Sequence, residues 1–316
     1  MITYRIPANA SGQRLDRFLV KFMPEAGKGL LMKMTRKKRI KLNGRRAEPK
    51  DTIQEGDTLT FYFSDETYAK FRGASADEAP KKKPLPDSLS ALIHPPLYED
   101  AQILAVNKPA GLLTQPDHTG DPSIADLAAV YADGTFHAAP ANRLDRGTSG
   151  VVLIPKNYET QKTLIRSIRE RKTHKTYLAL VFGALTQPGR CDDQLLREHN
   201  KTRVSDSGNG VHAALRYRPI QSNGGFTLLE IELFTGKTHQ IRAQLAHIGH
   251  PIVGDVKYGS KKANQTFRDR YHLNHPLLHA AHYTLSAPTL SFDIQAPIED
   301  PAFLAILHAL NFNKAI

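Results

Sequence analysis

Residues 142–155 read Asn-Arg-Leu-Asp-Arg-Gly-Thr-Ser-Gly-Val-Val-Leu-Ile-Pro. Asp145 stands between two arginines, whose positive charges favour the ionised form of its carboxyl group. The glycines and small hydroxyl residues after it allow a tight turn, and the apolar run from Val151 to Ile154 predicts a buried strand. Such a carboxylate is either part of a solvated ion-pair turn or a candidate nucleophile, and this stretch alone leaves both interpretations open.

Further segments on both sides give the stretch a context. Together with residues 142–150, they resemble the signature segments of the RluA-type pseudouridine synthases, in the same order along the chain. They are Asn107–Gly111 (NKPAG), Lys175–Val181 (KTYLALV), Thr235–Arg242 (TGKTHQIR), Gly249–Asp255 with Tyr258-Gly259, and Leu278–Ala280 (LHA). The similarity runs from about Tyr98 to Leu310 and therefore covers most of the chain.

The resemblance implies an enzyme that converts uridine in RNA to pseudouridine, with no metal and no cofactor. In the family, a carboxylate either adds to the pyrimidine ring or assists departure at the ribose, and this catalytic aspartate corresponds to Asp145. Tyr177 corresponds to the tyrosine that packs on the uracil and removes the C5 proton. Arg242 corresponds to the basic residue that forms an ion pair with the aspartate.

Three more residues are implied as substrate-binding. Arg143 takes the position that enters the base stack as the target base leaves it, and Leu278 the position that lines the uracil pocket. Lys108, in the NKPAG segment, is the third. The chain departs from the family pattern at Asn142, where the family has histidine, and at Lys237, where it has arginine.

Composition agrees with a nucleic-acid partner. The 316 residues include 43 Lys and Arg against 31 Asp and Glu, a net charge of +12, which favours binding to a polyanion. The one cysteine, Cys191, excludes an internal disulfide and a cysteine-based zinc site. No apolar run is long enough to span a membrane. We therefore expect a cytoplasmic monomer with RNA as its partner and no membrane contact.

Residues 1–63 are expected to form a separate module. Leu15, Phe18, Leu19 and Phe22 share a helical face, a second helix follows Gly29, and residues 58–63 predict a strand. The module resembles the small S-four-like (alpha-L) RNA-binding domain. Its predicted RNA-binding residues are Arg17, Lys33, Arg36, Lys37, Lys38, Arg39, Lys41, Arg45 and Arg46.

Residues 64–90 are predicted to be a flexible linker, because they are rich in Ser, Ala and Pro and contain the run Lys81-Lys82-Lys83. Residues 91–316 are predicted to form the catalytic domain. Strands are expected near residues 103–106, 151–154, 177–182, 213–217 and 227–234, and helices near 124–131, 160–169, 238–248 and 301–310. This alternation predicts an α+β fold around a mixed or antiparallel sheet, in agreement with the fold that the resemblance implies.

Other functions fit the sequence less well. Histidine pairs such as His247/His250 suggest zinc, but no H-E-x-x-H segment accompanies them, and Ser149 lacks the G-x-S-x-G spacing of a serine hydrolase. The appended module resembles the arrangement in family members that modify large-subunit ribosomal RNA, which is the expected substrate. Transfer RNA, or a role as a non-catalytic RNA-binding or ribosome-assembly factor, is the alternative.

Overall fold

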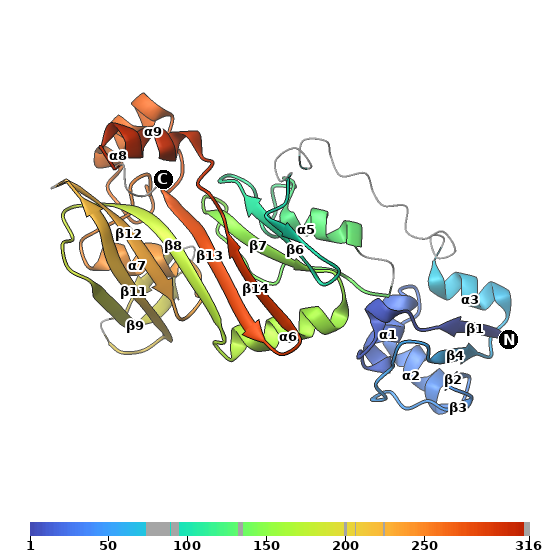
Figure 1. Cartoon of the computed structure of the whole chain (residues 1–316). Coiled ribbons are helices and arrows are strands. Elements are labelled where there is room, and N and C mark those ends of the chain that lie inside the picture. Colours follow the sequence, from blue (N-terminus) through green and yellow to red (C-terminus); the bar gives the residue numbers. More distant parts are fainter. Residues whose placement is uncertain are drawn as a thin grey trace.

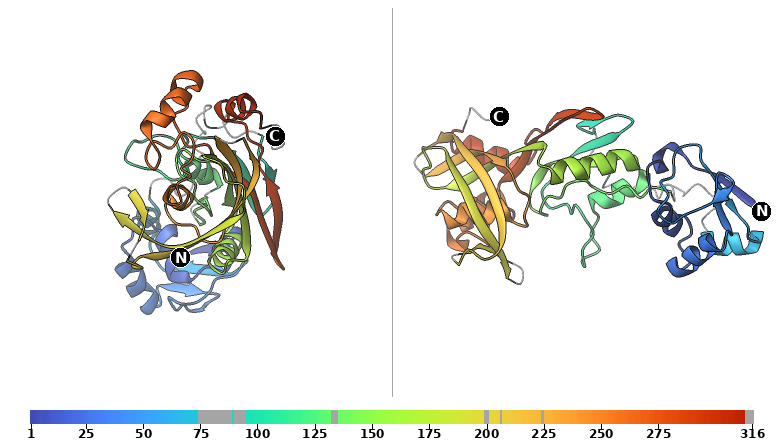
Figure 2. Two further views of the ribbon diagram at one scale, coloured as in Figure 1. Left: turned by 90° about the vertical axis from the view of Figure 1, so that its left-hand side faces the viewer. Right: turned by 90° about the horizontal axis from the view of Figure 1, so that it is seen from below.

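The computed structural model describes residues 1–73, Leu89, and residues 95–131, 135–198, 201–205, 207–223 and 225–312. Within these ranges the chain forms a small four-stranded sheet near the N-terminus and a ten-stranded sheet that contains all the later strands. Figures 1 and 2 show the N-terminal module at one end of the molecule, beside the larger sheet.

The N-terminal module packs two helices against a short antiparallel sheet of order β1-β4-β2-β3. All four apolar residues of the predicted first helix are fully buried, so that helix and its face are confirmed. The second helix and the strand are confirmed too, although the strand ends two residues early. The elements are β1 (Ile2–Arg5), η1 (Ala8–Ala10), α1 (Leu15–Phe22), α2 (Lys28–Arg36), β2 (Ile40–Leu42), β3 (Arg45–Arg46) and β4 (Thr58–Phe61).

The prediction of a linker is wrong over its first residues. Helix α3 (Asp65–Arg72) follows β4 directly, and the Ser64 hydroxyl caps it by accepting a hydrogen bond from the Thr67 N–H at 3.3 Å. Tyr68 and Phe71 pack against the aromatic core of the module. The helix therefore belongs to the module, and the rest of the predicted linker, including the lysine run, lies outside the described residues.

The larger sheet has the order β10-β9-β11-β12-β8-β13-β7-β6-β5, with β14 beside β13. All neighbours are antiparallel except β7 and β13, so the predicted α+β fold with a mixed sheet is confirmed. The strands are β5 (Tyr98–Glu99), β6 (Ile103–Lys108), β7 (Ser149–Pro155), β8 (Thr173–Phe182), β9 (Gly189–Glu198), β10 (Lys201–Val204), β11 (Val211–Ser222), β12 (Phe226–Leu233), β13 (Leu278–Ala287) and β14 (Leu290–Gln295).

The helices flank the sheet at the predicted places, with α8 in addition. They are α5 (Ile124–Ala128) continued by η2 (Ala129–Tyr131), α6 (Tyr158–Arg169), α7 (Gln240–His247), α8 (Lys261–Tyr271) and α9 (Pro301–Ala309). Strands β6 and β7 are buried on both faces: Leu104 and Val152 pack into one hydrophobic cluster, and Ile103 and Val151 into another. This explains why Val151–Ile154 is a continuous apolar run.

Strand β13 joins the two halves of the large sheet. Its first residues pair in parallel with the start of β7, His279 opposite Ser149, while its other edge pairs with β8, Ala280 opposite Tyr177. A Cβ atom on Gly150 would lie 2.2 Å from the Ala280 carbonyl oxygen, so only glycine permits this approach. The Ser149 hydroxyl lies 2.8 Å from His279 Nδ1, and His279 Nε2 donates to the Ala296 carbonyl at 2.9 Å.

The N-terminal module also directly contacts the part of the chain that forms the larger sheet. Gln13 is fully buried, and its Nε2 donates to the Thr135 carbonyl at 3.0 Å. Lys21 donates to Gln13 Oε1 at 3.2 Å and lies over the Tyr158 ring at the start of α6. The two parts therefore meet in a polar contact beside α6.

Candidate active site

The loop that carries Asp145 is fixed to the strand that follows it. The Asn142 side chain donates to the Val151 carbonyl and accepts from the Leu153 N–H, both at 2.9 Å. Thr114 holds the loop from the opposite side: its hydroxyl donates to the Leu144 carbonyl at 2.9 Å and accepts from the Leu144 N–H at 3.2 Å. The amide at position 142 thus extends the ladder of β7 and has a structural role of its own.

Lys108, predicted as substrate-binding, is buried and does not line the cleft described below. Its side chain is fully buried, and its Nζ donates to the carbonyls of Pro109, Leu112 and Arg146 at 3.0, 2.7 and 3.2 Å. Burial lowers the pKa of Lys108 to about 7, although the charge of Asp145 opposes that shift. Lys108 therefore ties the NKPAG turn to the Asp145 loop.

An open cleft of about 750 Å³ lies over the Asp145 loop, β8 and the start of α7. The other predicted residues, Asp145, Tyr177, Arg242, Arg143 and Leu278, all line it. Asp145 is the one acidic residue among its described lining residues, whereas the basic ones are Arg143, Arg146, Arg169, Arg171, Lys175, Arg197, Lys237 and Arg242. The cleft thus combines a single carboxylate with strongly cationic walls, which suits a polyanion.

Arg242 holds Asp145 from the buried side of the cleft. Its Nη1 lies 3.1 Å from Asp145 Oδ2, while its Nε and Nη2 bind the two oxygens of Asp255 at 2.7 and 3.0 Å. Burial alone would lower the pKa of Arg242, but its hydrogen bonds and ion pairs with Asp255 and Asp145 raise it. A permanent cation therefore stands between a buried carboxylate, Asp255, and a partly exposed one, Asp145.

The arginines beside Asp145 in the sequence are not its ion-pair partners in the described structure. Arg146 turns away, with Nη2 2.7 Å from Asp121 and Nε 3.0 Å from the Gly111 carbonyl. Arg143 is exposed along the cleft. The ion-pair partner of Asp145 is Arg242 instead, almost a hundred positions later in the chain.

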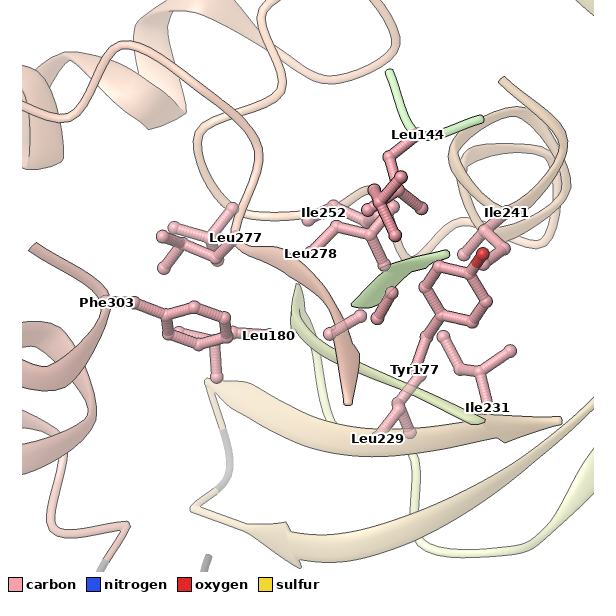
Figure 3. Close-up of a cluster of buried hydrophobic side chains, with 14 of the residues drawn as sticks. Leu144, Tyr177, Leu180, Leu229, Ile231, Ile241, Ile252, Leu277, Leu278 and Phe303 are labelled. Carbon is pink, nitrogen blue, oxygen red and sulfur yellow. The ribbon is translucent and has the colours of Figure 1, made fainter. Parts of the chain in front are cut away.

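An apolar surface forms the floor of the cleft. Tyr177 and Leu278, on neighbouring strands, are buried, and Figure 3 shows the Tyr177 ring among Ile231, Ile241 and Leu278. Burial, together with the charge of Asp145, raises the pKa of Tyr177, so the phenol keeps its proton in the free protein. A planar base can lie here against apolar side chains with the carboxylate beside it.

Known proteins resemble this chain in sequence and in fold. Residues 102–247 match the model of the RNA pseudouridylate synthase family. The chain is 33% identical to "Ribosomal large subunit pseudouridine synthase D" of Xanthomonas campestris pv. campestris over 261 residues, which cover 80% of this chain and 73% of the relative. The protein of that name from Haemophilus influenzae is 29% identical and covers 95% and 91% of the two chains.

The chain belongs to the RNA pseudouridylate synthase family. It is a pseudouridine synthase, an enzyme that acts on RNA. Among solved structures, "Human RNA Pseudouridylate Synthase Domain Containing 4" shares the fold, with a TM-score of 0.59 and 23% identity over 71% of this chain and 95% of that one.

Three residues of the pseudouridine synthase site were not singled out from the sequence. Asp255 is fully buried and binds Arg242, while His239 and Tyr258 lie beside the Asp145 loop, 2.9 Å apart between Nδ1 and the hydroxyl. All three stand within the quoted segments Thr235–Arg242 and Gly249–Gly259. The signal was present, but sequence order does not show that these two segments meet at Asp145.

The predicted RNA-binding residues of the pseudouridine synthase are all accessible, and only Lys41 is half-buried, with its Nζ 5.0 Å from the centre of the Tyr62 ring. Those on α2 and after it, from Lys33 to Arg39, form a dense exposed group. In the described part of the chain, no three His, Cys, Asp or Glu side chains are grouped to hold a metal, and no helix is long and apolar enough to cross a membrane.

Proposed function

We propose that this pseudouridine synthase isomerises specific uridines of large-subunit ribosomal RNA, with Asp145 as the catalytic carboxylate. The observation that carries the assignment of Asp145 is its position: the one acid of a cationic cleft, ion-paired with Arg242 above an apolar floor. The ribosomal substrate is supported by relatives named for the large ribosomal subunit and by the basic N-terminal module.

The reaction requires the N1–C1′ bond to break and a C5–C1′ bond to form, while C5 loses a proton and N1 gains one. The target nucleotide must first leave its stack, at a cost of a few kcal/mol that phosphate and stacking contacts offset. In the proposal, Arg143 fills the vacated space in the RNA, and Tyr177 and Leu278 hold the extruded base. The cationic walls bind the flanking phosphates.

Tyr177 acts late in the proposed sequence. A covalent bond between Asp145 and the nucleotide, at base or ribose, removes the negative charge of the carboxylate. That charge is one of the two causes that raise the pKa of Tyr177. Loss of that charge lowers the pKa of Tyr177, so the phenol releases its own proton to the solvent more easily after the bond to Asp145 has formed than before it. The phenolate oxygen can then accept the C5 proton.

We further propose that residues 1–73 form an RNA-binding module of the S-four-like type, that a catalytic domain follows, and that the enzyme is a cytoplasmic monomer. The exposed cations of α2 and the separate hydrophobic core of the module support its role. Light scattering at micromolar concentration tests the oligomeric state.

The decisive test is pseudouridine mapping of total RNA from a strain that lacks the gene, complemented with wild-type protein or with Asp145→Asn. We expect specific uridines of large-subunit ribosomal RNA to lose modification and only the wild type to restore it. Loss confined to transfer RNA would overturn the substrate, and full restoration by Asp145→Asn would overturn the role of Asp145. Unchanged maps would favour a non-catalytic RNA-binding factor.

A further inference from the structure

His239 occupies a constrained position at the edge of the cleft. It precedes α7 with a left-handed backbone (φ 54°), a conformation that non-glycine residues adopt rarely and that clusters at functional sites. Its ring is largely buried, with Nδ1 2.9 Å from the Tyr258 hydroxyl and Nε2 3.8 Å from Asp145 Oδ2. The ring thus spans the space between Tyr258 and the carboxylate.

The partner on the far side determines which ring nitrogen carries the proton. The Tyr258 oxygen accepts a hydrogen bond from the Thr202 N–H of β10 at 2.8 Å, and burial raises the pKa of Tyr258, so its hydroxyl stays protonated. The hydroxyl proton also needs an acceptor, and His239 Nδ1 lies 2.9 Å away, so we assign the hydroxyl as the donor to Nδ1. The proton of the neutral imidazole is then on Nε2, facing Asp145.

Burial, more than the surrounding charges, favours the neutral form of the His239 ring. Burial lowers the pKa of His239; the charge of Asp145 raises it, Arg242 and Lys257 lower it, and Asp255 raises it, with a net lowering. A neutral donor next to Asp145 adds a hydrogen bond without adding a second full cation beside Arg242. Arg242 and His239 both approach Oδ2, which leaves the other carboxylate oxygen, Oδ1, turned to neither of them.

We propose that His239 is a positioning residue for Asp145: its Nε2–H closes onto Oδ2 when RNA fills the cleft, so that Oδ1 is the oxygen that reacts with the nucleotide. Active-site hydrogen bonds are often long in the free enzyme and shorten in the substrate complex. Arg242 and His239 then both donate hydrogen bonds to Oδ2, from two directions. The hydrogen bonds of Tyr258 with His239 and with the Thr202 N–H fix the orientation of the imidazole ring. The proposal rests on the catalytic role of Asp145.

The test uses the full-length enzyme and two matched substitutions. His239→Asn suits the left-handed backbone but is too short to reach Asp145, whereas His239→Gln can place its amide N–H where Nε2 stands. Single-turnover rates of pseudouridine formation and RNA dissociation constants are measured for both on a ribosomal stem-loop that the wild type modifies. His247→Asn, at the exposed far end of α7, is the control.

We expect His239→Asn to lower the single-turnover rate about 10- to 100-fold, with an RNA dissociation constant and melting temperature near those of the wild type. His239→Gln restores most of the rate. Tyr258→Phe lowers the rate less, and adding it to His239→Asn lowers the rate no further, because both act through the same proton.

A single-turnover rate of His239→Asn within twofold of the wild type overturns the inference. A defect of His239→Asn in RNA binding alone also overturns it, as does a loss of rate in His239→Gln as large as that in His239→Asn. If His239→Asn does not fold, Tyr258→Phe decides, since a wild-type rate in that variant has the same meaning. These outcomes leave the proposed function intact, which fails only if the wild type forms no pseudouridine or Asp145→Asn forms as much.

Discussion

Arg242 connects two carboxylates that differ in their surroundings. Asp255 is almost wholly buried and also accepts the backbone N–H groups of Lys257 and Tyr258 at 3.0 and 3.1 Å, so it is fixed on its own turn. Asp145 is about a quarter exposed and holds one guanidinium nitrogen. The planar guanidinium of an arginine can donate hydrogen bonds to both carboxylates at once, whereas the single ammonium group of a lysine cannot.

We therefore expect Arg242→Lys to lower activity by more than about 100-fold, because it loses the geometry that orients Asp145. It should also destabilise the fold by roughly 1–3 kcal/mol, because lysine keeps the positive charge but cannot satisfy both oxygens of the buried Asp255 as the guanidinium does. Single-turnover rates and urea denaturation measure both effects. Arg218→Lys, whose partner Glu230 lies at an exposed site, should change stability by less than about 1 kcal/mol. Equal effects of the two substitutions would contradict the role of Arg242.

His279 gives the second prediction at this scale. Burial lowers the pKa of His279 below the usual 6.5. As the pH falls below 6.5, His279 therefore binds a proton in the unfolded chain but stays neutral in the folded protein. Stability should fall as the pH drops from 7 to 5, with His279 contributing at most about 1.4 kcal/mol of unfolding free energy per pH unit. His279→Asn should reduce this slope without abolishing it, because His239 shifts in the same direction.

Urea denaturation at several pH values tests this expectation, with His247→Asn as the exposed control. Identical slopes for the wild type and His279→Asn would show that the buried ring does not control acid stability.

Asp145, Tyr177 and Arg242 could be singled out as candidate site residues from sequence because each stands in a segment with a recognisable pattern, and the structure brings all three to one cleft. Their partners could not. Arg146 adjoins Asp145 in the chain but pairs with Asp121, and the buried position of Lys108 depends on how two turns pack together. A local pattern identifies reactive groups, whereas contacts between distant turns decide which groups face one another.

At the scale of elements, the apolar periodicities predicted five strands of the large sheet and four of its helices. They missed the short strands β5 and β10, helix α8, and the hairpin of β13 and β14, although the residues of β14 are alternately buried and exposed. Strand β9 went unpredicted, since its residues Arg190, Asp192 and Asp193 form a charged, mostly exposed surface. Helix α3 went unpredicted because its two aromatic residues stand among polar ones, in a stretch whose composition is typical of linkers.

Helix α3 should be needed for a stable N-terminal module. We expect a fragment of residues 1–73 to be more stable than a fragment of residues 1–63 by roughly 2–4 kcal/mol, because the shorter one loses the packing of Tyr68 and Phe71. Thermal melts followed by circular dichroism compare the two. Phe71→Ala in the longer fragment should lower its stability by part of this difference. Equal melting temperatures of the two fragments would contradict the contribution of α3.

At the scale of the whole molecule, basic surface occurs in two separate places, the cleft and the N-terminal module. Each cation that neutralises a phosphate makes RNA binding more dependent on salt. For single-stranded RNA, it steepens the slope of the logarithm of the binding constant against the logarithm of the salt concentration by about 0.7. If both surfaces contact the same RNA, their contributions to this slope add.

We expect the triple variant Lys33→Gln, Arg36→Gln, Lys37→Gln to bind its RNA more weakly and with a flatter salt dependence, while chemistry on a short stem-loop at saturating enzyme is retained. Lys261→Gln with Lys262→Gln, exposed on α8, removes charge elsewhere and is the control. Filter binding across a salt series gives the slopes. An unchanged slope in the triple variant would refute RNA contact by α2.

The central place of β13 has a consequence for how this protein is made. The strands before it form two sets, β5 to β7 and β8 to β12, and β13 alone joins them in the described sheet. Ribosomes release the N-terminal residues first, so the two sets emerge long before Leu278 does. The nascent chain therefore exposes two open sheet edges until late in synthesis, and the site around Asp145 closes only when β13 arrives. Pairing across so long a stretch of chain is slow, and aggregation during this interval is the hazard that chaperones would have to limit.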